Sequence, residues 1–419
     1  MRPWQESWKR RKQILFVQCV LDVKPGMPEY FDYAKSLMPL ELPLGIATEE
    51  ERHICWEPGR ESNGTFLVLG ASGSGKTETL KKLGKHIAEE AIPVLVIDFH
   101  GDVIFPGINS VLLSGSMTSF LGINPLELDS CAAMQTGLYE QRAILLEMIR
   151  RVVRLGHKQY SLLLEVVERA YREKGILDDS PMTWGYSPPS LPDVLTLLRW
   201  RADNDNSADE RNLARGCLSA VSAVFGHPIF QRHYYLTSTD ILRGNLRIDL
   251  SNINSEAIRY IVAETLLRKV LRVLRLQGPI PVNPAGDSER FRLFIMIDEA
   301  KILSTFGDNV NSSGHILNIL ATEGRKYGIG LILASQMGEH FGHELKASAG
   351  TWLVMKPMDE REARRNAPNA HVSPTALTAL VGHGDGYFRT GTSPTSRLIQ
   401  IDRIYQKPFQ GEVDTIVAD

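Results

Sequence analysis

Short apolar runs, each followed by glycine or polar residues, recur along the chain. Three of them lie at residues 66–69, 94–97 and 293–297. Runs of this length and composition are typical of strands that are buried on both faces of a sheet. Between the first two runs, apolar residues return with a helical period up to about residue 90. Because strand, helix and strand follow one another, the pattern predicts an α/β fold with a mainly parallel sheet.

The same reasoning predicts the other elements. Strand patterns occupy residues 246–251, 329–336, 351–356, 384–389 and 397–401, and helical patterns occupy residues 256–276 and 359–366. Residues from about 130 to 235 are mostly helical, with apolar periodicity at 139–149 and 160–171. We therefore divide the chain into a small β-containing region at residues 1–62, the first part of the sheet domain at 63–129, a helical insertion at 130–240, and the second part with the terminal strands at 241–419.

The first apolar run ends in a glycine-rich loop, Gly70-Ala71-Ser72-Gly73-Ser74-Gly75-Lys76-Thr77, which fits the phosphate-loop pattern G-x-x-x-x-G-K-[ST] at every position. Glycines let the backbone curl closely enough for several N–H groups to surround one triphosphate. We expect the whole loop to bind nucleotide, with Lys76 reaching the β- and γ-phosphates and the Thr77 hydroxyl binding Mg²⁺. The positive N-terminal end of the following helix would face the same anion.

The third apolar run ends in two carboxylates, Asp298 and Glu299. Together with a phosphate loop, a buried strand that ends in Asp-Glu is typical of the second half of a nucleotide-hydrolysis site. We expect Asp298 to hold the metal, directly or through water, and Glu299 to polarise the attacking water as a catalytic residue. The strand pattern at 329–336 ends in Gln336, which is placed to sense the γ-phosphate or to orient water. Capping of the following loop is the alternative role for this glutamine.

Arg325 lies in a glycine-flanked segment, where we predict a turn. A guanidinium on such a turn could project into the nucleotide site of a neighbouring subunit and raise the rate of hydrolysis. A surface salt bridge is the alternative. Asp98 and His100 follow the strand at 94–97, at the edge where α/β proteins build their sites. Either a role near the nucleotide or a simple turn fits these two residues.

Basic residues occur together at two places. The helix at residues 256–276 carries Arg268, Lys269, Arg272 and Arg275 on a face that we expect to be exposed. Phosphates of DNA could bind there, although an ordinary solvated helix face explains the same charges. Arg2 and residues 9–12 form a second basic group, to which the same two explanations apply.

Composition indicates a globular protein with a large core, since the chain has 419 residues, 43% hydrophobic residues and a net charge of −2. No apolar run approaches the roughly 20 residues that span a bilayer, and the N-terminus lacks a signal-peptide pattern, so we expect a cytoplasmic protein. Cys19, Cys55, Cys131 and Cys217 are far apart and indicate neither a zinc site nor a disulfide framework. We expect them to be buried as small apolar side chains.

Taken together, the motifs resemble the HerA/FtsK superfamily of DNA-pumping ATPases, and HerA in particular. The resemblance rests on the phosphate loop and on residues 98–101, 249–251, 297–300, 323–328 and 334–336. It covers roughly residues 63–405, and the ordered set of motifs is far more specific than any one of them. HerA proteins usually carry a larger N-terminal β-barrel than residues 1–62 allow, which is a departure from the family pattern.

The resemblance implies a RecA-like P-loop core assembled into a homo-hexameric ring, with ATP and Mg²⁺ at the subunit interfaces and double-stranded DNA in the central channel. Carried onto this chain, it implies nucleotide and Mg²⁺ ligands at Lys76 and Thr77, metal and catalytic carboxylates at Asp298 and Glu299, a sensor at Gln336 and a finger acting in trans at Arg325.

We therefore hypothesise an ATP-driven double-stranded DNA translocase that works with a separate nuclease or other effector, in DNA processing or anti-phage defence. The remaining carboxylates and histidines are scattered without metal-ligand spacing, so the sequence indicates no nuclease site in this chain. An ATP-dependent scaffold that regulates assembly of a defence complex, without pumping DNA, is the alternative. A coupling ATPase of the conjugation type is a third option, which the lack of an apolar membrane segment disfavours.

Overall fold

The computed structural model describes residues 39–401 apart from residues 117–118, 129–136, 233, 243, 285, 307–313 and 394. The basic group near the N-terminus, Cys19 and Cys131 lie outside the described residues. Cys217 is buried as expected, whereas Cys55 is half-buried. Among the helices of the described ranges, none is long and apolar enough to cross a membrane.

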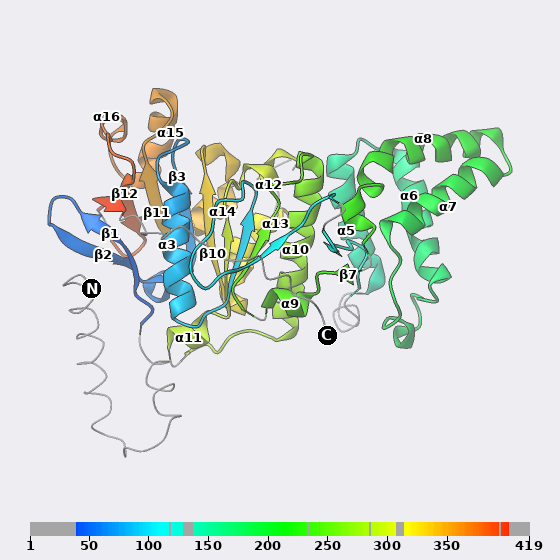
Figure 1. The fold of residues 1–419 in the computed structure, drawn as a ribbon, viewed down its shortest axis with the longest axis horizontal. Helices are drawn as coiled ribbons and strands as arrows, with labels where there is room; N and C mark the ends of the chain where they lie inside the picture. Colours follow the sequence, from blue (N-terminus) through cyan, green and yellow to red (C-terminus); the bar gives the residue numbers. More distant parts are fainter. Residues whose placement is uncertain are drawn as a thin grey trace, which may run out of the picture.

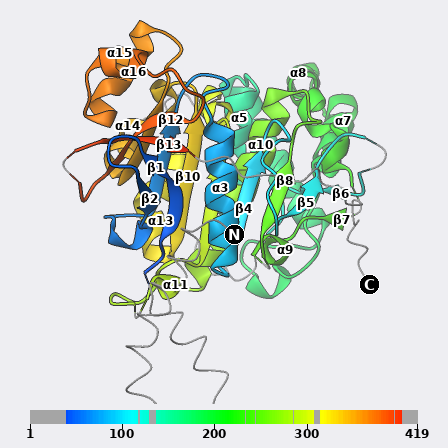
Figure 2. The same cartoon turned by 60° about the vertical axis from the view of Figure 1, so that its left-hand side comes forward.

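One large sheet runs through the molecule, with the strand order β2-β1-β13-β12-β11-β3-β10-β9-β4-β8-β5 (Figures 1 and 2). Its strands are β1 (Leu42–Ala47), β2 (Arg52–Trp56), β3 (Thr65–Leu69), β4 (Val94–Asp98), β5 (Asn109–Leu112), β8 (Leu246–Asp249), β9 (Leu293–Ile297), β10 (Ile329–Ser335), β11 (Thr351–Met355), β12 (Asp385–Thr390) and β13 (Arg397–Ile401). Neighbours from β11 to β5 are parallel, and those from β2 to β11 are antiparallel. The predicted α/β fold with a mainly parallel sheet is confirmed.

Apolar cores on both faces explain why the central strands are continuous apolar runs. Every residue of β3, β9 and β10 is buried. Because successive side chains of a strand point to opposite faces, Leu67 and Leu69 of β3 enter one core, while Phe66 and Val68 enter the other. The apolar pattern therefore determines the register of these strands as well as their burial.

Helices cover both faces of the sheet (Figures 1 and 2). Helix α3 (Lys76–Glu89) packs its apolar residues into the core that contains Phe66. Helices α10 (Glu256–Leu276) and α13 (Ile316–Tyr327) pack into the core that contains Leu67. Short helices complete the second half of the chain: α11 (Asp287–Arg290), α12 (Lys301–Thr305), α14 (His343–Ser348), α15 (Glu360–Ala370) and α16 (Pro374–Thr378).

The segment between β5 and β8 is mainly helical and extends from one end of the sheet (Figure 1). It contains the two-stranded sheet of β6 (Leu121–Gly122) and β7 (Tyr234–Tyr235) and the helices α5 (Leu138–Val152), α6 (His157–Glu173), α7 (Leu191–Asn204), α8 (Ala208–Phe225) and α9 (Ser238–Leu242). Its apolar residues belong to the same core as those of α10 and α13. The division of the chain into domains at residues 62, 129 and 240 stays a prediction.

Helix α10 has the predicted bounds, but its basic residues do not form the exposed face that we expected. Lys269 is buried and pairs with Glu127. Arg268 is half-buried and donates to the buried Glu264, four residues earlier in the same helix. The expectation is wrong because α10 lies against the large core, so that most of its circumference is buried. Only Arg275 reaches clearly into solvent, where it pairs with Glu323.

A buried arginine joins the carboxyl ends of β4 and β8. Arg247 Nε donates to Asp98 Oδ2 at 2.7 Å, and its Nη2 donates to Asp249 Oδ2 at 2.8 Å. Asp98 is fully buried and Arg247 nearly so. Because an unpaired charge is costly in such a place, this ion pair fixes the strand ends that lead into the turn at residues 99–102.

The first prediction concerns this ion pair. Arg247→Met would leave the buried carboxylate of Asp98 without its cation, and we expect the free energy of unfolding to fall by about 3–5 kcal/mol. Urea unfolding followed by circular dichroism measures the change. Arg275→Met is the matched control, because its ion pair with Glu323 is about two-fifths exposed on both sides and should contribute at most about 1 kcal/mol. Equal losses in the two variants would contradict this account.

Candidate nucleotide-binding site

The phosphate loop connects β3 to α3 and needs its glycines for two reasons. Gly73 and Gly75 have φ angles of 75° and 114°, in the region that side chains rarely adopt. A Cβ on Gly75 would also lie 3.0 Å from Met355 Cε and 3.1 Å from Gly384 Cα. The loop therefore curls tightly, with β11 and the turn before β12 packed directly against it, and α3 begins at its lysine.

Lys76 holds the loop open from the inside. Its Nζ donates to the carbonyl oxygens of Gly70 and Ala71, at 2.9 Å each. An ammonium group has three N–H donors, so one remains for a phosphate oxygen. Burial lowers the pKa of Lys76, and the carboxylates of Asp298 and Glu299 oppose that shift. An anion bound at the loop would likewise favour the charged lysine.

A cavity of about 730 Å³ opens in front of the loop. It is lined by Ser72, Gly73, Gly75, Lys76, Thr77, Glu78, His100, Asp102, Asp298, Glu299, Gln336, His383, Gly384 and Ile401. Most of the residues that the sequence suggested for the site therefore meet at one cavity, because β3, β9 and β10 are adjacent and parallel. Of the predicted loop residues, Gly70, Ala71 and Ser74 do not line this cavity.

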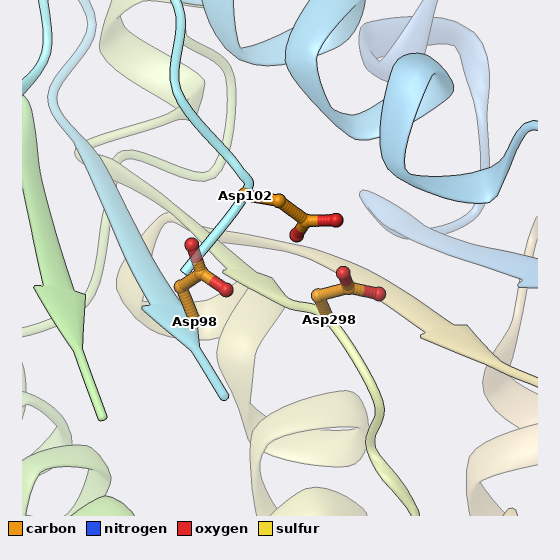
Figure 3. A group of neighbouring side chains, drawn as sticks. All are labelled: Asp98, Asp102 and Asp298. Carbon is orange, nitrogen blue, oxygen red and sulfur yellow. The ribbon is translucent and has the colours of Figure 1, made fainter. Parts of the chain in front are cut away.

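Asp298 stands at the end of β9 beside the phosphate loop. Thr77 Oγ1 donates to Asp298 Oδ2 at 3.2 Å, so the two predicted Mg²⁺ ligands are adjacent. Asp98, Asp102 and Asp298 each bring a carboxylate oxygen within 4.8 Å of the others (Figure 3). Burial, followed by the charges of Asp102 and Asp98, raises the pKa of Asp298 to about 6, although His100 and Thr77 act in the opposite direction.

The three carboxylates do different work. Asp98 accepts backbone N–H groups of His100, Gly101 and Val103 at 2.8–3.1 Å, in addition to the Arg247 guanidinium. The carboxylate oxygens of Asp98 therefore hold the turn at residues 99–102 in shape. Of the two roles that the sequence left open for Asp98, this supports the structural one. The oxygens of Asp298 and Thr77, with the exposed Asp102 beside them, suit a hard divalent cation such as Mg²⁺.

Glu299 is held in an unusual conformation. Its φ angle is 59°, in the left-handed region that is strained for a residue with a side chain. Strain of this kind costs on the order of 1–3 kcal/mol and concentrates at functional sites. Glu299 is buried, and its Oε2 accepts the Nε2–H of Gln336 at 3.0 Å. Its Oε1 has no hydrogen-bond partner within the described part of the chain.

Arg325 differs from our expectation in its local structure. It lies in the last turn of α13 rather than in a turn, and Gly328, with a φ angle of 78°, ends that helix. Its side chain is exposed and has no ion-pair or hydrogen-bond partner among the residues that the structure describes. The 7 residues of β10 separate this end of the sheet from Gln336, which at 3.3 Å per residue is roughly 23 Å. Arg325 therefore lies far from the cavity of its own subunit.

Sequence reasoning missed part of the lining. His383 and Gly384 lie in the turn before β12, and Ile401 is the last residue of β13. The glycine pair around Asp385 was the only local signal, and it indicates a turn without saying what the turn touches. Asp102 directly follows the motif at residues 98–101, but its place beside Asp298 is evident only from the fold.

A parallel sheet that brings a phosphate loop, an Asp-Glu pair and a glutamine to one edge defines a P-loop ATPase with a RecA-like core. Residues 63–270 match the family model described as Helicase HerA, central domain. The resemblance to the HerA/FtsK superfamily is thereby confirmed.

Two kinds of relatives share sequence with the chain. It is 22% identical over 375 residues to the DNA double-strand break repair helicase HerA of Sulfurisphaera tokodaii, which covers 84% of this chain and 70% of that protein. It is 26% identical over 308 residues to the DNA import protein CedB of Sulfolobus acidocaldarius, which covers 71% of this chain. The match spans only 44% of CedB, so this chain corresponds to less than half of that protein.

Solved structures show the same fold. VirB4 of Thermoanaerobacter pseudethanolicus superposes with a TM-score of 0.66 at 16% identity, covering 87% of this chain and 96% of that one. The bacterial conjugative coupling protein TrwB, in a form lacking its first 70 residues, gives 0.61 at 15% identity, covering 89% and 91%. TrwB has been solved with analogues of GTP and of ATP and with ADP and Mg²⁺. At these identities the likeness concerns the fold alone.

The second prediction concerns the carboxylate at the end of β9. Without metal and nucleotide, Asp298→Asn should stabilise the protein at pH 8. The pKa of Asp298 rises from 3.8 to about 6 on folding, so wild-type stability falls between about pH 4 and pH 6 and stays low above that range. Removing the charge recovers up to about 3 kcal/mol at pH 8, less about 1 kcal/mol for the weakened Thr77 hydrogen bond.

Urea unfolding at several pH values measures this difference, and the gain should shrink toward pH 4. Asp179→Asn removes an exposed carboxylate and serves as the control. A gain that is the same at pH 8 and near pH 4, or that appears equally in the control, would contradict the account.

Proposed function

We propose that this chain is an ATP-driven double-stranded DNA translocase of the HerA type, working as a homo-hexameric ring. The observation that carries the proposal is the meeting of the phosphate loop, Asp298 and the Glu299–Gln336 pair around one cavity. Nucleotide binding alone has no need of a strained, buried glutamate, whereas hydrolysis needs a base close to the phosphates. Two relatives are named for DNA break repair and for DNA import, which supports DNA as the substrate.

Five residues of the cavity have a direct part in the proposed hydrolysis. Lys76 donates its remaining N–H to the β- and γ-phosphates, and the backbone of the phosphate loop surrounds them. Mg²⁺, held by Thr77 and Asp298, would neutralise the charge of the same phosphates. Glu299 Oε1 accepts a proton from the attacking water, while Gln336 holds Oε2 and so orients the carboxylate. The products are ADP and phosphate.

Arg325 fits the proposal as a finger that acts in trans. Its guanidinium has no partner among the described residues and is too far along β10 to reach the cavity of its own subunit. In a head-to-tail ring, the same surface of each subunit faces the nucleotide site of the next. An arginine supplied in this way neutralises charge in the transition state and accelerates hydrolysis by orders of magnitude.

A separate effector completes the proposal. Within the described ranges, the carboxylate cluster that could hold a metal ion consists of Asp98, Asp102 and Asp298, and it belongs to the nucleotide site. DNA cleavage would therefore be the task of another protein, such as a nuclease in DNA processing or anti-phage defence.

Basic residues of α10 are poor candidates for DNA contacts, because Arg268 and Lys269 are already paired within the fold.

The third prediction tests the catalytic base. Glu299→Gln keeps the size of the side chain and an oxygen that can accept from Gln336, but it removes the base, so turnover should fall about 10²- to 10⁴-fold. ATP hydrolysis is measured with and without long double-stranded DNA, and nucleotide binding is measured in parallel. Wild-type turnover should rise with DNA, while the variant should bind nucleotide normally. Turnover indifferent to DNA, or absent until another protein is added, would favour the assembly scaffold instead.

The fourth prediction tests the finger by mixing two inactive variants. Arg325→Ala subunits keep an intact cavity, and Glu299→Gln subunits keep an intact arginine. If Arg325 acts in trans, co-expressed rings regain up to about a quarter of wild-type turnover, because half of the cavities and half of the fingers are intact. Lys326→Ala, in the same exposed helical turn, should remain active and is the control. Mixed rings as inactive as their parents would contradict a role in trans.

A further inference from the structure

The turn that precedes β12 lies directly against the phosphate loop. Gly384 N–H donates to the carbonyl of Ser74 at 2.8 Å. His383 Nδ1 lies 2.6 Å from the carbonyl oxygen of Gly73. A carbonyl can only accept, so the proton of this hydrogen bond is on Nδ1. Two consecutive carbonyls of the loop are thus bound by residues from the far end of the sequence.

Packing supports the same contact. A Cβ on Gly73 would have one neighbour within 4 Å, and that neighbour is His383 Cε1 at 4.0 Å. The imidazole is therefore the side chain that covers the tip of the loop. Beside it, Gly384 limits the space at Gly75, whose Cβ would approach the Gly384 nitrogen to 3.2 Å.

The turn itself is built to hold this position. Asp385 Oδ2 accepts the Gly382 N–H at 2.8 Å. The Gly384 carbonyl in turn accepts the N–H of Ile401, the last residue of β13, at 2.9 Å. His383 is exposed and lines the nucleotide cavity, yet its backbone is fixed on both sides by these hydrogen bonds. The side chain is presented to the loop by a rigid support.

The hydrogen bonds from the turn to the loop carbonyls also determine where the N–H groups of the loop point. The C=O and the following N–H of a trans peptide point in opposite directions. Holding the Ser74 carbonyl outward turns the Gly75 N–H inward, toward the space for phosphate. The Gly73 carbonyl is held outward in the same way, while the Ser74 N–H on the other side donates to Ala71 at 3.2 Å and closes the curve of the loop.

We propose that His383 is a positioning residue for nucleotide binding, which holds the phosphate loop in its receptive shape through the Nδ1–H bond to Gly73. The proposal rests on the proposed function, since it concerns the same cavity. His383 acts through the loop and not on the reacting atoms, so its loss raises the dissociation constant for nucleotide and leaves turnover at saturation nearly unchanged. Its bond is lost without a cavity in either core, because the side chain is exposed.

The fifth prediction compares two replacements that each keep one nitrogen of the ring. Asparagine places its amide nitrogen near the Nδ1 position, and glutamine places its amide near Nε2. Titration with a fluorescent ATP analogue and Mg²⁺ measures the dissociation constant. His383→Ala should raise it about 3- to 10-fold, the range expected for one hydrogen bond. His383→Asn should stay within about twofold of wild type, and His383→Gln should resemble alanine.

Controls separate this inference from the function on which it rests. Val381→Ala changes a side chain of the same turn that is 86% exposed, and it should bind like wild type. Lys76→Ala defines the signal without specific binding. If wild type binds no better than Lys76→Ala, the proposed function fails, and this inference fails with it. If wild type binds and His383→Ala binds equally well, or if glutamine rescues and asparagine does not, only the inference is overturned.

Discussion

The pairing of β10 with β3 on one side and with β9 on the other is the constraint on which the site depends. Leu333 lies opposite Leu67 of β3 and Ile297 of β9. Because the three strands are parallel and end at the same edge of the sheet, the residues that follow each strand meet at one cavity. A slip of one residue would exchange the side chains between the two cores, so the packing of the sheet also protects the geometry of the site.

Several features of the site destabilise the fold, and the packing of the two cores offsets them. Asp298 keeps a carboxylate where burial and neighbouring charges raise its pKa, and Glu299 keeps a left-handed backbone. Lys76 is a buried cation next to both. None of these three features stabilises the fold, and a common substitution at each position would remove the destabilising charge or backbone strain. Because such features concentrate at functional sites, their occurrence together at one edge of an apolar sheet indicates a catalytic site and not merely a well-packed turn.

The sequence predicted the placement of site residues that follow a strand directly, because strand patterns are local. The phosphate loop, Asp298 and Gln336 belong to this group. The predicted turn at Arg325 was wrong because Gly324 lies inside helix α13. A Cβ on Gly324 would lie 3.3 Å from Ile329 Cβ, so this glycine lets the helix pack closely on β10. The contact of His383 with the loop joins residues 310 positions apart, and only the strand order of the whole sheet reveals it.

The place of β13 has a consequence for biosynthesis. This strand lies between β1 and β12, so the first described strand of the chain finds its sheet partner in the last. A ribosome makes β1 and β2 before the other strands of this sheet, but the strand with which β1 pairs does not exist until residues 397–401 have emerged. Until then the hairpin of β1 and β2 lacks this sheet partner, and Leu42, Leu44 and Trp56, which are buried in the complete fold, have only part of their core to pack against. The sheet is therefore completed only after residues 397–401 have been made, and the same late step docks the turn of His383 onto the phosphate loop.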